Sequence, residues 1–155
     1  MRYPLEEIRK ISDELVELIK PYCKRIEVCG SIRRKCETCK DIDIVLIPND
    51  LTNLKNFLSK ICDIEKGGNK WISCRFKGIQ VDIAICNERN YEVWRLVRTG
   101  SRNFNVKLIM KAKKLGYGFK LNFGLIKDGK VVDNTERGII EKVFGRYIEP
   151  EDRSW

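Results

Sequence analysis

Histidine is missing altogether from this chain of 155 residues. Without an imidazole, the protein has neither a His general acid or base nor a His-ligated zinc site. Any chemistry is therefore expected to rest on carboxylates and on the metal ions that carboxylates bind.

Long hydrophobic runs are also missing. No apolar stretch approaches the roughly 20 residues that a membrane-spanning helix needs, and the N-terminus shows no signal-peptide core. We therefore expect an intracellular protein that contacts no membrane.

Cysteine occurs seven times, an odd number, and the pattern lacks what a zinc site requires. Cys36 and Cys39 form a CxxC pair, but no second pair completes four ligands. Two reduced thiols are the favoured interpretation of this pair, and a local disulfide is the alternative.

Positive charge is in excess, and the formal net charge is +9. Such an excess is typical of proteins that bind a polyanion, although a solvated basic surface is the alternative. The length suits one domain, or two small ones that share a core.

Residues 28–47 form the most informative stretch, and they predict a strand, a turn and a second strand. Asp41 and Asp43 lie two apart on the second strand, so both side chains leave the same face and repel each other unless a cation lies between them. Asp82 lies in another apolar run. Three carboxylates on adjacent strands favour a site for hard cations such as Mg²⁺, acting on a phosphate that the Gly30-Ser31 turn helps to bind. The alternative is that the carboxylates only solvate a half-exposed strand.

The remaining pattern predicts an α+β, mixed α/β fold in which a mixed sheet packs on helices. We expect two units, residues 1–90 and a small α+β unit at 91–155. Periodicity and turn residues predict helices over residues 5–20, 51–62, 91–98, 103–115 and 136–144, and strands over 26–29, 41–47, 71–76, 79–86, 119–126 and 131–132.

Several motifs carry a resemblance to a known family. Residues 30–34 (GSIRR), 41–43 (DID) and Asp82 resemble the nucleotidyltransferase core of the DNA polymerase X family, the DNA polymerase beta-like enzymes. Residues 99–105 (TGSRNFN) resemble its T-G-S-x-x-F-N motif. Residues 2–4 (RYP) and 149–154 (EPEDRS) resemble its first and closing segments, so the resemblance runs from end to end.

The resemblance implies a nucleotidyltransferase palm at residues 1–90 and a domain for the nucleotide and nascent base pair at 91–155. It implies a monomeric DNA polymerase that binds DNA and dNTPs, adds deoxynucleotides to a primer 3′-end and fills short gaps in DNA repair. Its cofactors would be two Mg²⁺ ions, which Mn²⁺ can replace.

The resemblance also implies roles for particular residues. Asp41, Asp43 and Asp82 would hold the metal ions, and Asp82 would receive the 3′-hydroxyl proton. The nucleotide would contact Arg2, Gly30, Ser31, Arg34, Gly100, Ser101 and Asn105. A basic run on one helix would bind DNA: Lys107, Lys111, Lys113 and Lys114. The Gly100–Ser101 peptide is expected to be cis and to face the cleft.

For each of these residues an ordinary structural role is the alternative. Arg33 and Arg34 would form a solvated basic loop, Asn105 would be an amide on a helix surface, and the lysines would form a solvated face. Arg34 is favoured over Arg33 as the functional residue.

The chain departs from the family pattern at several positions. Val97-Arg98 replaces a Tyr-Phe pair, Gln80 and Ile109 replace arginines, and Arg102 replaces an acidic residue. Counterparts of the family's lyase domain and helix-hairpin-helix are missing, so no lyase activity is expected. The layout resembles the reduced viral members.

Two other functions stay open. One is a nucleotidyltransferase that acts on RNA or a small acceptor, and the other is a non-catalytic nucleic-acid-binding protein.

Overall fold

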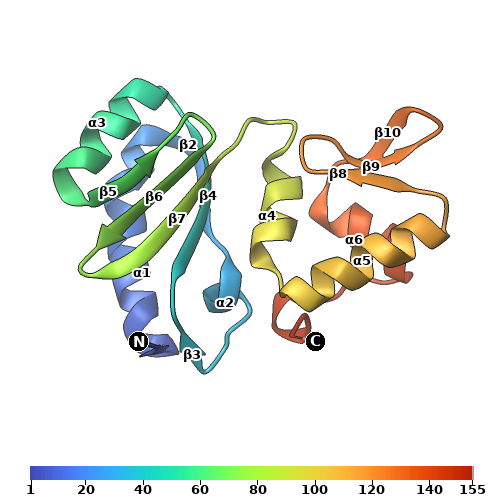
Figure 1. The fold of residues 1–155 in the computed structure, drawn as a ribbon, viewed down its shortest axis with the longest axis horizontal. Coiled ribbons are helices and arrows are strands. Elements are labelled where there is room, and N and C mark those ends of the chain that lie inside the picture. Colours follow the sequence, from blue (N-terminus) through green and yellow to red (C-terminus); the bar gives the residue numbers. More distant parts are fainter. Residues whose placement is uncertain (155) are drawn as a thin grey trace.

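The computed structural model describes residues 1–154, which form two lobes connected through helix α4 (Figure 1). The N-terminal lobe contains β1 Tyr3–Pro4, α1 Leu5–Ile19, η1 Lys20–Tyr22, β2 Cys23–Val28, α2 Gly30–Arg33, β3 Thr38–Cys39, β4 Ile42–Pro48, α3 Leu51–Ile61, β5 Asp63–Gly67, β6 Trp71–Phe76 and β7 Ile79–Ile85. The C-terminal lobe contains α4 Tyr91–Thr99, α5 Arg102–Lys114, β8 Gly118–Lys120, β9 Gly124–Lys127, β10 Lys130–Asp133, α6 Glu136–Phe144 and η2 Pro150–Asp152. The expected α+β fold with a mixed sheet is confirmed.

The N-terminal lobe is built on a five-stranded sheet in the order β2-β4-β7-β6-β5, with α1 and α3 on one face (Figure 1). Apolar side chains recur at helical spacing on α1 and α3, and these stripes pack on alternate residues of the strands. Strand β5 was not predicted. Its residues are all exposed, so the alternation of apolar and polar residues that marks a half-buried strand is missing.

Strand β4 positions the acidic residues by simple alternation. Ile42, Ile44 and Leu46 enter the core under α1 and α3, so the intervening side chains point to the opposite face. There Val45 is covered by residues of α4, whereas Asp43 lies nearer the beginning of the strand. Strand β7 runs parallel to β4, and its Asp82 is in register with Asp43.

Helix α4 packs against both lobes. Tyr91 and Trp94 contact the face of the N-terminal sheet, while Val93 and Leu96 belong to the core of the C-terminal lobe. The boundary between residues 90 and 91 lies where this helix begins, and it stays a prediction. Among the described residues, no helix is both long and apolar enough to cross a membrane.

The small C-terminal sheet corrects one prediction. Residues 119–126 are not one strand: β8 and β9 are antiparallel neighbours separated by a turn at residues 121–123. Gly124 follows that turn with a φ of +88°, and a Cβ there would collide with the backbone oxygen of Asp133. A glycine in this conformation interrupts a strand. The apolar residues on either side of the turn had predicted one continuous strand.

Candidate active site

A pocket of about 460 Å³ lies between the two lobes. Its lining contains eight of the residues predicted from the sequence: Arg2, Gly30, Ser31, Arg34, Asp41, Asp43, Gly100 and Asn105. It also contains four that were not in that set: Lys40, Val97, Arg98 and Arg102. Asp82 is not among the lining residues, but its strand position is directly beside that of Asp43.

The three carboxylates act on one another electrostatically. Burial raises the pKa of Asp43, the charges of Asp82 and Asp41 raise it further, and Arg98 opposes the shift. Arg98 Nη2 donates to Asp43 Oδ1 at 2.6 Å, so a guanidinium from the C-terminal lobe partly neutralises the acidic site. Sequence reasoning noted Arg98 only as a departure from the family pattern and missed this contact.

Asp82 is held from one side by polar neighbours. Ser73 Oγ and Gln80 Nε2 both donate to Asp82 Oδ1, at 3.0 and 3.1 Å. Trp71 Nε1 in turn donates to Ser73 Oγ at 3.0 Å. These bonds fix the direction in which the carboxylate points.

The donor chemistry of these residues fits a hard divalent cation, because every candidate ligand is a carboxylate oxygen. Within residues 1–154, however, no group of three or more Cys, Asp or Glu side chains is gathered closely enough to hold a metal ion. One oxygen of Asp43 is bonded by Arg98. The predicted turn at Gly30-Ser31 is instead the start of the short helix α2. Gly30 leaves room for Asp43, because it has a φ of +61° and a Cβ there would collide with Asp43 Oδ2.

Two polar atoms beside the pocket lack a partner within the protein. Arg34 Nε and Asn105 Oδ1 are both buried and make no hydrogen bond, while one other nitrogen of each side chain donates to a backbone oxygen. Arg34 Nη1 donates to Thr99 O at 2.6 Å, and Asn105 Nδ2 donates to Val97 O at 2.9 Å. Because an unsatisfied buried polar atom costs about 1–3 kcal/mol, such atoms at a pocket indicate a ligand site. The alternatives of a solvated loop for Arg34 and a surface amide for Asn105 do not describe these contacts.

The backbone at Gly100–Ser101 has the predicted conformation. The peptide is cis, and Gly100, with a φ of +68°, lines the pocket. Ser101 Oγ accepts from Phe104 N at 3.2 Å and so caps α5. Arg2 reaches the other side of the pocket, where its guanidinium donates to both Oγ1 and the backbone oxygen of Thr38 at 2.9 Å.

Arg33 is not a solvated basic residue. Its guanidinium makes two bonds to Glu136, at 2.6 and 2.8 Å, and so connects α2 to α6 of the other lobe. Arg153 Nη1 lies 2.8 Å and Arg95 Nε 3.1 Å from the same carboxylate, whose side chain is only 2% exposed. Burial alone would raise the pKa of Glu136, but the bonds and charges of Arg33 and Arg153 lower it. This centre was not predicted, although Arg153 stands in the closing motif that resembles the family's.

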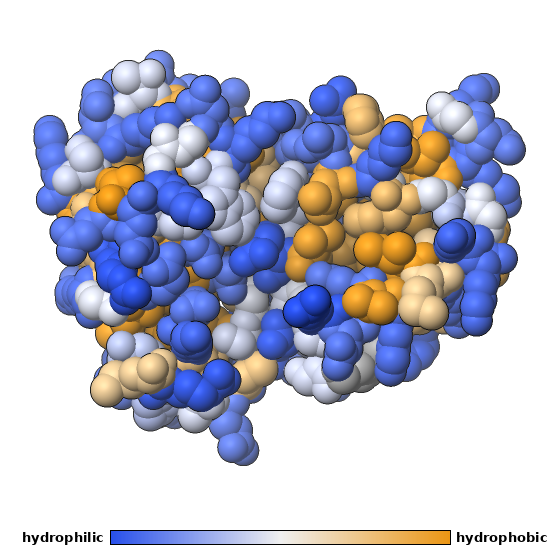
Figure 2. Space-filling model, viewed as in Figure 1, coloured by the Kyte–Doolittle hydropathy of each residue, from blue (hydrophilic) through white to orange (hydrophobic). Residues whose placement is uncertain are grey.

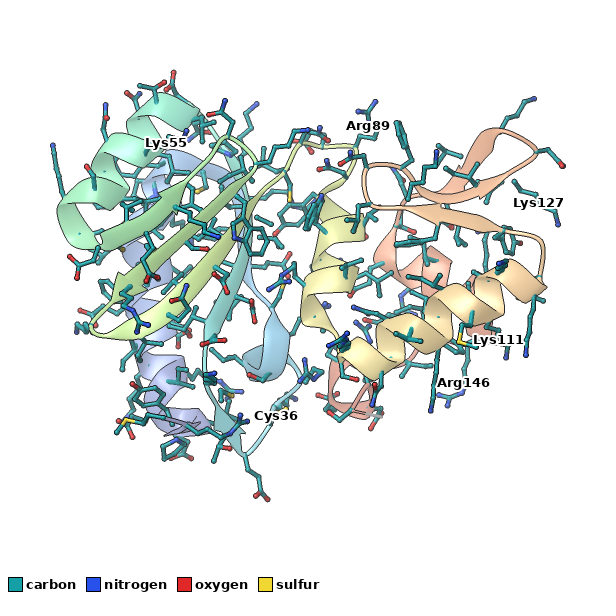
Figure 3. The ribbon with its side chains drawn as sticks, viewed as in Figure 1. Cys36, Lys55, Arg89, Lys111, Lys127 and Arg146 are labelled. Carbon is teal, nitrogen blue, oxygen red and sulfur yellow. The ribbon has the colours of Figure 1, made fainter. Side chains whose placement is uncertain are left out.

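The predicted DNA-binding lysines are all exposed on α5. Positions 107, 111 and 114 share one side of the helix by spacing, whereas position 113 lies on another. Lys111 Nζ lies 5.5 Å from the ring centre of Phe144, on the part of α5 farther from the N-terminal lobe (Figure 3). In the N-terminal lobe, Cys36 and Cys39 are both free thiols, as favoured from the sequence.

Comparison with known proteins agrees with this geometry. The family model for the DNA polymerase beta palm matches residues 2–72, and the model for the DNA polymerase beta thumb matches residues 95–154. A protein named Repair DNA polymerase X, from African swine fever virus (isolate Pig/Kenya/KEN-50/1950), is 29% identical over 154 residues, covering 88% of this chain and 86% of that protein. The same-named protein of the isolate Tick/Malawi/Lil 20-1/1983 is 28% identical with the same coverage. The chain thus belongs to the DNA polymerase X family, the DNA polymerase beta-like enzymes.

Proposed function

We propose that this protein is a DNA-directed DNA polymerase that adds deoxynucleotides to a primer 3′-end and fills short gaps during DNA repair. The observation that carries the proposal is the pocket, which joins strand carboxylates to the unpartnered Arg34 Nε and Asn105 Oδ1. The viral relatives, named Repair DNA polymerase X, support the same activity.

Asp41, Asp43 and Asp82 would hold two Mg²⁺ ions, or Mn²⁺ in their place. Bound divalent cations stabilise the attacking and leaving oxygens of an in-line phosphoryl displacement. Carboxylate oxygens suit either ion, and the absence of His and of a closed Cys₄ set disfavours zinc.

The chain's own groups have separate tasks in this proposal. Asp82 accepts the proton of the primer 3′-hydroxyl, with its carboxylate oriented by Ser73 and Gln80. Arg34, with Arg2, Gly30 and Ser31, binds the nucleotide phosphates, because a guanidinium can donate to two phosphate oxygens at once. Gly100, Ser101 and Asn105 bind the sugar and base of the incoming nucleotide.

A gap-filling assay tests the proposal directly. We expect the protein to extend a labelled primer across a one-nucleotide gap with a dNTP and Mg²⁺, and EDTA to stop the reaction. Nucleotide transfer to an RNA or small-molecule acceptor without extension of DNA would instead support the second enzyme class. DNA binding without any transfer would support a non-catalytic protein.

Replacing Arg34 should weaken the binding of the nucleotide phosphates. We expect Arg34→Ala to lower kcat/KM for the dNTP by roughly 10- to 1000-fold, since about 1.4–4 kcal/mol of charge-assisted bonding is lost. The Kd for DNA should barely change. Lys35→Ala is the matched control, because Lys35 is the next basic residue along the chain and pairs only at the surface with Glu151. A large rise in the DNA Kd with unchanged nucleotide kinetics would show that Arg34 contacts DNA instead.

DNA affinity should depend steeply on salt. Each neutralised phosphate of duplex DNA contributes a slope of about −0.9 to log K against log salt concentration. We expect Lys114→Ala to reduce the slope by about one, because Lys114 is exposed on the basic side of α5. Lys60→Ala, an exposed change on α3, should leave the slope unaltered. A Kd that does not vary with salt contradicts this electrostatic account.

Arg98 should compete with metal ions for Asp43. In the protein without bound metal, the Arg98 guanidinium bonds the Asp43 carboxylate, so a metal ion must displace it. Arg98→Ala should therefore lower the Kd for Mn²⁺ by about tenfold, as measured by isothermal titration calorimetry. Arg102→Ala removes the same charge from the pocket lining and serves as the control. Equal effects of both variants would attribute the change to overall charge and not to the contact with Asp43.

A further inference from the structure

The outer face of the small thumb sheet carries a groove that none of the proposed polymerase residues line. It has a volume of about 620 Å³ and lies across β8, β9 and β10. Gly118, Ile126 and Val131 are directly abreast in the strand register and form its centre. Because Gly118 has no side chain and the other two are apolar, this part of the sheet is a smooth hydrophobic surface.

Aromatic rings and cations surround that surface. The side chain of Phe123 lines the groove, and the residue is 37% exposed. The Arg89 guanidinium lies 5.0 Å from the Phe123 ring centre, and Lys127 Nζ lies 5.1 Å from that of Tyr117. Arg89 and Lys127 mark opposite ends of this sheet in Figure 3. Lys120 and Lys127 both line the groove, whereas Asp128 is the single acidic residue in its lining. An exposed ring beside several cations fits the bases and phosphates of single-stranded nucleic acid.

Helix α5 connects this groove to the nucleotide pocket. Arg102 and Asn105, in its first turns, line the pocket, and Gly116, just beyond its end, lines the groove. Between them Val106, Ile109 and Met110 are 49%, 46% and 57% exposed. Figure 2 shows hydrophobic side chains gathered over this helix and the adjoining sheet. An apolar track therefore runs beside the basic side of α5.

The length of the track gives the number of nucleotides between the nucleotide pocket and the near end of the groove. Asn105 and Gly116 are separated by a helical rise of about 16 Å. Stacked nucleotides of one strand rise by about 3.4 Å each, so the track spans about five of them.

From these observations we propose that the single-stranded template ahead of the coding base lies along α5, enters the groove beside Gly116 about five nucleotides away, and stacks a base on Phe123 farther along the groove. This inference rests on the proposed polymerase function and adds a second template-binding site to it. A second copy of this chain is the competing occupant, since β10 is an edge strand with Val131 and Val132 exposed. The charge balance favours nucleic acid, because two copies that each carry a net charge of +9 repel.

The test uses the full chain and primer–templates whose 5′ template overhang is 2, 4, 6, 8 or 10 nucleotides. Fluorescence anisotropy at fixed salt gives the Kd for each. We expect affinity to rise by about tenfold between overhangs of 4 and 8 nucleotides and then to level off, as the outermost base enters the groove. Equal affinity for all overhangs overturns the proposal.

Variants at one exposed position separate stacking from simple apolar contact. Phe123→Ala and Phe123→Leu should both lose most of the overhang-dependent gain, whereas Phe123→Trp should keep it. Leu18→Ala, an equally exposed apolar change on α1, is the control and should keep the gain. If Phe123→Ala keeps the full gain, or if it converts a dimer to a monomer in sedimentation, the groove does not hold template.

This result is distinguishable from failure of the proposed function. Extension on the 2-nucleotide overhang should be the same in the wild type and in Phe123→Ala, because Phe123 does not line the nucleotide pocket. If the wild type does not extend even that substrate, the polymerase proposal itself is wrong. If it extends normally but shows no dependence on overhang length, only the groove proposal is wrong.

Discussion

Replacing Asp43 with asparagine is expected to lower the rate of primer extension by roughly a thousandfold or more, about 4 kcal/mol of transition-state stabilisation. The change keeps the shape of the side chain and removes the charge that a divalent cation and Arg98 both need. Single-turnover primer extension measures the loss, and Asp13→Asn, an exposed change on α1, is the control. Extension by Asp43→Asn at a tenth of the wild-type rate or more would contradict the metal-binding role.

The same variant should be more stable at neutral pH, although it is inactive. Burial and the neighbouring carboxylates raise the pKa of Asp43, so the ionised form is disfavoured in the folded protein. Its destabilising effect is absent below the unfolded pKa, near 3.9, and reaches its full size above the raised folded pKa. We therefore expect Asp43→Asn to exceed the wild type in free energy of unfolding at pH 7, and this advantage to disappear as the pH falls below about 4. Urea unfolding at several pH values measures it.

Metal addition gives a readout that does not depend on activity. Mg²⁺ should raise the melting temperature of the wild type, because an ion that binds only the folded state stabilises it. It should leave Asp43→Asn almost unchanged. An equal shift in both proteins would place the binding site elsewhere.

Replacing Glu136 with glutamine should cost about 3–5 kcal/mol of unfolding free energy. The carboxylate is buried and bonds Arg33 and Arg153, with Arg95 close by, so its loss leaves buried cations without a compensating charge. Urea unfolding measures the cost, and Glu141→Gln on the exposed side of α6 is the control. A loss below about 1 kcal/mol would show that water or other groups replace the carboxylate.

Acid should erase the stability that Glu136 contributes. Because its arginine partners lower the pKa of Glu136, the contribution is complete above the unfolded pKa, near 4.3, and is lost as the pH falls through the lower folded value. The difference between the wild type and Glu136→Gln should therefore shrink below about pH 4. A difference that stays constant down to pH 2 would assign the effect to shape and not to charge.

Much of the site was predictable because it depends on short-range spacing. The i and i+2 spacing of Asp41 and Asp43 predicted that both side chains lie together, and both line the pocket, although β4 begins only at Ile42 and Asp41 precedes the strand. Glycine at position 30 was predicted to end the first strand, as it does, but its positive φ and its close approach to Asp43 were seen only in the structure. The family motifs then connected Gly100 and Asn105 to the same pocket, where the structure places both.

The contacts between lobes were not predictable from such spacing. Arg98 meets Asp43 across 55 residues of chain, and Arg33 meets Glu136 across 103. Nothing local distinguishes these residues from solvated arginines and from an ordinary acidic residue in the first turn of a helix. The turn that separates β8 from β9 was missed for a related reason: a close approach between Gly124 and Asp133 decides it, and the apolar pattern does not record that approach.

Three features could be read directly from the amino-acid sequence: the lack of histidine, the excess of positive charge, and the alternation that puts Asp43 on the sheet face opposite the apolar core. Three others became visible only in the folded protein: the arginine that neutralises Asp43, the carboxylate that joins the lobes, and the path of α5 from the nucleotide pocket to a groove on the thumb. The difference lies in the range of the interactions. Side-chain direction follows from the backbone period over a few residues, whereas a charge pair between the lobes or a groove across three strands depends on how segments distant in sequence pack together.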